Sequence, residues 1–184
     1  MSLLLFRLAL FLILLATGGF IVYIISQNRP AYRWSYRILL AGFVCHTLFI
    51  AHQYYTLGVA PVLTLKAALS FFSWTIIGAY LIFHLKFRLM VLGSFIAPLA
   101  ACLMIVSLSI PGVEVNIKPI FRSMWLTVHV VTIFVGNGIF AMTFMAAIMY
   151  LIQEHQIKKK RLGSFYNRLP SLETLDAINR YSLM

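Results

Sequence analysis

The stretch SMWLTVHVVTIFVGNGIFAMTFM, from Ser123 to Met145, is almost wholly apolar, yet it carries His129, Asn137 and two glycines. A run of about 20 apolar residues is long enough to cross a bilayer as an α-helix. Polar side chains inside a bilayer are costly, so they usually have a partner or a function there. The stretch therefore predicts a membrane-spanning helix that carries a site.

The composition of the whole chain points to the same class of protein. Of its 184 residues, 62% are hydrophobic and only 10% are charged, whereas a soluble domain usually carries about 25% charged residues. The mean hydropathy is +0.94. We therefore expect a polytopic membrane protein rather than a soluble globular domain.

The predicted fold is an all-α membrane bundle that forms a single domain over residues 1–184. Five apolar runs are long enough to span a bilayer, at about residues 3–26, 38–57, 65–83, 89–110 and 124–152. A basic loop follows at residues 153–176. The final stretch SLETLDAINRYSLM reads as an amphipathic helix turning apolar, which predicts the start of a sixth span in a longer protein.

The distribution of basic residues predicts how the bundle is oriented. The formal net charge is +11, but the basic residues lie in short loops beside apolar runs, which is typical of topology signals at a lipid surface and not of nucleic-acid binding. One side holds Arg29, Arg33, Arg37, Lys86, Arg88, Lys158, Lys159, Lys160, Arg161 and Arg168, and the other only Arg7, Lys66, Lys118 and Arg122. The positive-inside rule then places the N-terminus outside and the loop 153–176 in the cytoplasm.

His129 is the first candidate site residue. It lies five residues into its span, which places it roughly 8 Å from the outer end of the helix. Trp125 precedes it by four residues and shares its helix face. An aromatic ring beside a shielded imidazole suits a flat, apolar, metal-centred ligand, and the alternative is a histidine bonded to a neighbouring helix or a water.

His46 is the second candidate, in FVCHTLFIAHQYY. It lies about nine residues, or roughly 13 Å, into its span, close to the middle of the membrane. A histidine this deep usually marks a path for an ion, a proton or a cofactor, although packing against a polar partner stays open. His52 is on a different face of the helix, while His84 and His155 are expected to be interfacial anchors.

The acidic residues, the cysteines and the absence of several catalytic motifs limit the kinds of site that the chain could form. All four acidic residues lie outside the spans, which disfavours a carboxylate-coupled pump or a hard-cation site and fits axial histidine ligation of haem iron. Cys45 and Cys102 are far apart and predict small core residues, not a disulfide or redox pair. The sequence has no phosphate loop, nucleophile elbow or HExxH motif.

An ordered series of motifs resembles the CcsA/ResC/HemX-like branch of the cytochrome c assembly proteins. It runs WLTVHVVTIFVGNGIFAMTFMAAIMYLIQEHQIKKKR and then RLPSLETLDAIN, and HTLFIAHQYYTLGVAPVLTLKAALSFFSW looks like the family's second and third spans. The resemblance covers most of the chain and is strongest from Trp125 to Asp176. It implies a protein of the bacterial cytoplasmic (inner) membrane that holds or exports haem b for attachment to apocytochrome c on the outer face.

The resemblance also implies roles and partners. His129 matches the family's outer axial ligand to haem iron, His46 matches a membrane-embedded histidine, and a CcsB/ResB-like membrane protein would be the partner. The family's W-G-x-x-W-x-W-D motif and second outer histidine have no match in this chain, so we expect no catalysis of haem attachment by it alone. Two alternatives stay open, namely a HemX-like regulator of haem biosynthesis and a scaffold subunit.

Overall fold

The computed structural model describes residues 2–59, 62–87, 89–112 and 123–158, and every regular element in these segments is an α-helix. The helices are α1 (Ser2–Ser26), α2 (Arg29–Leu57), α3 (Leu65–Phe87), α4 (Gly93–Ser109) and α5 (Met124–Lys158). The prediction of an all-α fold is confirmed. The expected start of a sixth span, and the loop after residue 158, lie outside the described residues.

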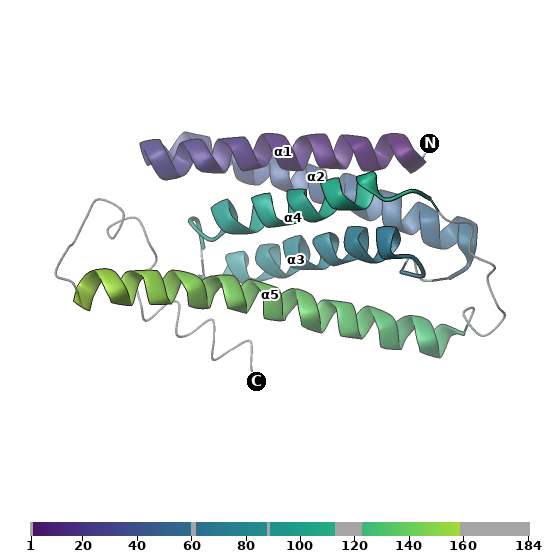
Figure 1. Ribbon diagram of the computed structural model, residues 1–184. Helices are drawn as coiled ribbons and strands as arrows, with labels where there is room; N and C mark the ends of the chain where they lie inside the picture. The colour runs from purple at the N-terminus through teal and green to yellow at the C-terminus, as the bar shows by residue number, and fades with distance from the viewer. Residues whose placement is uncertain (1, 60–61, 88, 113–122, 159–184) are drawn as a thin grey trace.

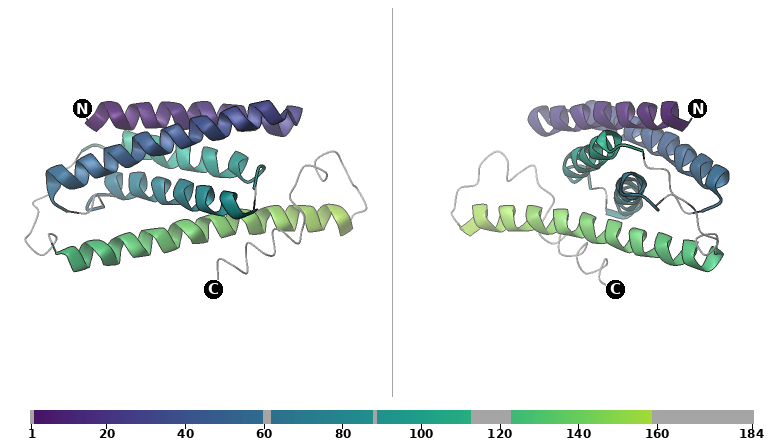
Figure 2. Two further views of the ribbon diagram at one scale, coloured as in Figure 1. Left: turned by 180° about the vertical axis from the view of Figure 1, so that it is seen from behind. Right: turned by 45° about the vertical axis from the view of Figure 1, so that its right-hand side comes forward.

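The five helices form three layers (Figures 1 and 2). In both figures α1 and α2 lie together on one side, α3 and α4 form the middle, and α5 covers the far side of α3. Successive helices run in opposite directions, so each end of the bundle holds a different set of helix starts and helix ends. One end holds the start of α1, the end of α2 and the start of α5, and we call it the His129 end.

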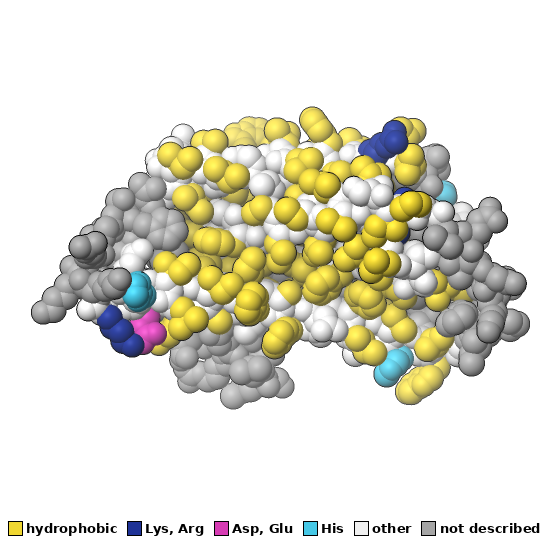
Figure 3. All heavy atoms as spheres, in the orientation of Figure 1, with side chains coloured by type: hydrophobic (Ala, Val, Ile, Leu, Met, Phe, Trp, Pro, Cys, Tyr) yellow, Lys and Arg dark blue, Asp and Glu magenta, His cyan; other side chains and the backbone are white. Residues whose placement is uncertain are grey.

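The basic residues gather at the other end of the bundle, which we call the basic end. It carries the start of α2, the end of α3 and the end of α5, with Arg29, Lys86 and Lys158. Figure 3 shows hydrophobic side chains across the visible face, with charged side chains only toward the two ends. This distribution is the one that an integral membrane protein requires.

Four helices are long and apolar enough to cross a membrane, namely α1, α2, α3 and α5. The fourth predicted span, 89–110, is only partly matched, because α4 covers the 17 residues Gly93–Ser109. At about 1.5 Å per residue α4 is roughly 25 Å long, which is shorter than a hydrocarbon core of about 30 Å. The turn at residues 90–92 takes up the other apolar residues at its start.

The second predicted span began too late. We expected residues 27–37 to form a loop, but α2 is helical from Arg29, and only Gln27 and Asn28 join it to α1. Pro30 lies in the first turn of α2, where a missing backbone N–H costs nothing. Gln27 makes the tight reversal with a positive φ of 54°.

Small residues allow the helices to approach closely. In α5 a Cβ at Gly138 would lie 2.9 Å from the backbone carbon of Thr75 in α3, whereas a Cβ at Gly136 would meet nothing within 4 Å. Gly138 therefore lies at a close approach of α5 to α3, whereas Gly136 does not. Cys45 packs against the core as predicted, but Cys102 is exposed and the prediction that it is a core residue was wrong.

Candidate functional site

The histidine in the middle of α2 is enclosed by three helices. His46 is 0% exposed, and its Nε2 lies 3.0 Å from the Oγ of Ser70 in α3. The ring of Phe6 from α1 packs edge-on against the imidazole at 5.9 Å, and Phe49 lies at 6.0 Å. One interpretation of His46 was that it packs against a polar partner in the bundle, and Ser70 is such a partner.

One nitrogen of His46 has no hydrogen-bond partner. Its Nδ1 is fully buried and unbonded, so one nitrogen of the ring remains available in an otherwise apolar interface. A buried polar atom without a partner costs free energy. The imidazole therefore contributes both a hydrogen bond that links α2 to α3 and an unsatisfied atom in the interface.

The histidine of α5 has the opposite surroundings. His129 is exposed, and among the described residues none hydrogen-bonds to it. Trp125, one helical turn before it, is 80% exposed, and Val128 is exposed as well. Trp125 and His129 are one turn apart in α5 and so share a helix face, as their spacing predicts, and this face lies away from the packed residues Gly138 and Met142.

The structure does not bring His46 and His129 together. The side chains around His46 come from α1, α2 and α3, and the middle layer separates α2 from α5 (Figure 1). Among the described residues, no group of three or more His, Cys, Asp and Glu side chains could hold a metal ion. His129 thus presents an exposed imidazole, with the exposed apolar side chains of Trp125 and Val128 beside it.

A tyrosine cluster at the basic end went unpredicted. His84, which we expected to be an interfacial anchor, is half-buried, and its Nε2 lies 2.7 Å from the hydroxyl of Tyr32. The rings of Tyr36 and Tyr80 lie 4.9 Å and 5.6 Å from the imidazole. The Tyr80 hydroxyl donates to the carbonyl of Leu89 at 3.3 Å, so the cluster ties together α2, α3 and the start of the α4 segment.

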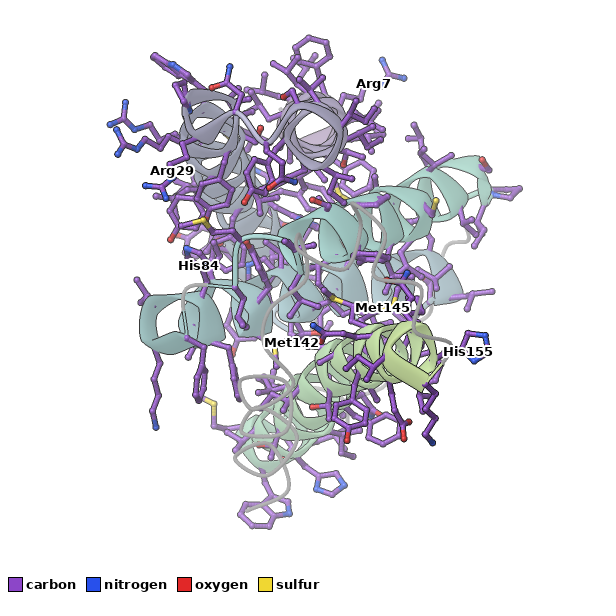
Figure 4. The ribbon with its side chains drawn as sticks, turned by 90° about the vertical axis from the view of Figure 1, so that its left-hand side faces the viewer. Arg7, Arg29, His84, Met142, Met145 and His155 are labelled. Carbon is purple, nitrogen blue, oxygen red and sulfur yellow. The ribbon has the colours of Figure 1, made fainter. Side chains whose placement is uncertain are left out.

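The sequence contained a signal for this cluster. Tyr32 and Tyr36 are four residues apart on α2, and Tyr80 and His84 are four residues apart on α3. Each pair forms an aromatic patch on one face of its helix. By contrast His155, the other expected anchor, is exposed on the outer side of α5 (Figure 4).

Comparison with known proteins places the chain among haem-related membrane proteins. Protein HemX of Brevibacillus brevis is 28% identical over 153 residues, and Protein HemX of Bacillus subtilis (strain 168) is 23% identical over 154 residues. Each match covers 83% of this chain and 56% of the relative. The chain therefore spans about half the length of the curated relatives it matches.

No solved structure matches the chain. The family model for the cytochrome c assembly protein matches residues 62–184. This match includes α3, α4 and α5, and so the helix that carries His129. The chain belongs to the cytochrome c assembly protein family.

Proposed function

We propose that this protein binds haem at the His129 end of α5 and holds it for attachment to apocytochrome c. The observation that carries the proposal is the exposed pair of His129 and Trp125 on one face of a membrane helix. A neutral imidazole is a common axial ligand to haem iron. Membership of the cytochrome c assembly family supports the assignment.

Each residue has a distinct part in the proposal. An imidazole nitrogen of His129 would bind the iron, and the exposed Trp125 ring would cover part of the porphyrin face and exclude water. Bound haem supplies an iron centre whose redox state responds to its axial ligands. A further iron ligand would come from a segment outside the residues that the structure describes.

His46 has a separate, transient part in the proposal, that of holding haem as it crosses the membrane. Because this side chain is buried among three helices, haem could reach it only if the helices moved apart. For iron to reach His46, the contacts with Phe6 and Ser70 would have to open. A role for His46 therefore predicts coupled movement of α1 and α3, whereas binding at His129 requires no such movement.

The distribution of basic residues supports an outer location for the site. Arg29, Lys86 and Lys158 lie at the end of the bundle opposite His129, and the basic end would face the cytoplasm of a bacterial inner membrane. The haem at His129 would then face the side on which cytochromes c mature. Accessibility of a single cysteine introduced beside His129 to an impermeant thiol reagent tests this orientation.

The absorption spectrum of the detergent-purified protein from haem-replete cells tests haem binding. We expect a Soret band that His129→Ala abolishes or shifts and that Trp125→Ala weakens. His155→Ala is the matched control, because His155 is an exposed histidine at the opposite end of the same helix, and it should leave the band unchanged. A spectrum without haem, or one that His129→Ala does not alter, would contradict the proposal.

The names of the relatives favour a second candidate function. Both are called Protein HemX, and a HemX-like regulator of haem biosynthesis is the alternative that the sequence left open. A deletion strain separates the two functions. Loss of holocytochrome c supports haem delivery, whereas raised haem precursors with normal cytochromes support regulation.

A further inference from the structure

Three arginines form a row on the exposed side of α2 at the basic end. Arg29, Arg33 and Arg37 follow one another at four-residue intervals and are all exposed, so they share one face of the helix. The opposite face packs into the bundle through Tyr32 and Leu39. We call the three residues the arginine ladder, and Figure 4 shows Arg29 on the outer side of the bundle.

The described part of the chain offers this row no compensating charge. Its one salt bridge joins Lys158 to Glu154, at the end of α5. Glu154 is also the one acidic side chain in the described ranges, since the other three, Glu114, Glu173 and Asp176, lie outside them. Like charges one turn apart on a helix repel each other, so the ladder favours an external anion.

The position of the ladder along α2 indicates where that anion would be found. The 29 residues of α2 span about 43 Å, compared with about 30 Å for the hydrocarbon core and about 40–45 Å with the headgroups. The apolar part of α2 begins at Ile38. The arginine ladder therefore lies at the level of the headgroups, where the phosphates are.

Trp34 is an exposed aromatic side chain beside the arginine ladder on α2. Its ring is 62% exposed, and the guanidinium of Arg37 lies over it at 5.4 Å from the ring centroid. Tryptophan is enriched at the level of the headgroups because one part of its ring is apolar and the other is polar. Stacking on an aromatic ring also orders a guanidinium before a ligand arrives.

We propose that the arginine ladder and Trp34 form a docking surface for the headgroup of an anionic phospholipid. A guanidinium presents two parallel N–H groups to a phosphate, a geometry that lysine cannot reproduce. Trp34 would pack against the glycerol region of the same lipid. The surface lies at the opposite end of the bundle from His129, so it is independent of the proposed haem site.

Lipid binding to the whole chain tests the proposal. Delipidated protein is mixed with equal amounts of phosphatidylglycerol and phosphatidylcholine, and bound lipids are counted by native mass spectrometry. We expect preference for phosphatidylglycerol to fall about fivefold for each arginine replaced by glutamine. Arg7→Gln, an exposed arginine at the His129 end, is the matched control and should retain the preference.

A second measurement locates the lipid. Brominated phosphatidylglycerol should quench the tryptophan fluorescence of the parent protein more than that of Trp34→Phe, and brominated phosphatidylcholine should show less of this difference. If the triple glutamine variant fails to fold, the triple lysine variant keeps the charge and should show an intermediate preference. Equal preference in parent and ladder variants, or no preference in the parent, overturns the proposal.

Discussion

The surroundings of His46 and His129 contrast sharply, although both histidines lie on apolar helices. His46 is enclosed by α1, α2 and α3 and bonds to Ser70, whereas His129 is exposed beside Trp125. A buried imidazole contributes to stability through its packing and its hydrogen bond. An exposed one contributes little to stability but keeps its nitrogens free for a ligand, so the two regions should respond differently to mutation.

The largest expected effect is on stability, at the enclosed histidine. His46→Ala removes the bond to Ser70 and leaves a cavity between Phe6 and Phe49. We expect the free energy of unfolding to fall by roughly 2–4 kcal/mol. Thermal unfolding in detergent, followed by circular dichroism, should show a midpoint lower by about 2–4 °C for each kcal/mol lost.

His129→Ala is the matched control for this comparison. Because His129 has no hydrogen bond to a described residue and is exposed, its removal should change the midpoint by less than about 2 °C. Equal loss of stability in the two variants would mean that His129 is also packed against a neighbour. The contrast between the two regions would then fail.

A second comparison concerns the two faces of α5. Gly138 faces α3, where a Cβ would lie 2.9 Å from the Thr75 backbone, and Gly136 faces open space. Gly138→Ala should lower the free energy of unfolding by about 1–2 kcal/mol through overpacking. Gly136→Ala should raise it by about 0.5–1 kcal/mol, because alanine favours the helix over glycine.

The opposite signs of these two substitutions make the test sharp. Both variants add one methyl group to the same helix, two residues apart, so differences in helix propensity cancel between them. Thermal midpoints measured in the same detergent give the comparison directly. Two midpoints that rise together would show that α3 and α5 are not tightly packed at Thr75.

The sequence predicted the position of His129 along its helix better than the direction in which side chains face. The helix that carries His129, α5, begins at Met124 as expected, whereas α2 begins at Arg29 and not at Ile38, so the residue count to His46 was too short. Which way each side chain faces was not predictable, because lipid tails and a helical core are equally apolar. Cys102 shows the consequence, since its apolar span gave no sign that it would be exposed.

Polar residues near helix ends were also poorly predicted. The run of arginines before Ile38 looked like a loop, yet α2 is helical from Arg29, because a helix can extend through the headgroup layer without burying its charges. His84 looked like a lone interfacial residue, and its partner Tyr32 lies 52 positions away in the chain. Pairing between distant segments depends on helix packing, which local periodicity does not encode.

The smallest expected effect concerns this distant pair. Tyr32→Phe removes the hydroxyl that lies 2.7 Å from Nε2 of His84 but keeps the buried ring. We expect the free energy of unfolding to fall by about 1 kcal/mol, the usual net contribution of one hydrogen bond. Tyr55→Phe is the control, because Tyr55 is 89% exposed and should show no change in thermal midpoint. If Tyr32→Phe were as stable as the parent, the Tyr32–His84 bond would contribute nothing, and ring packing alone would hold α2 against α3 at the basic end.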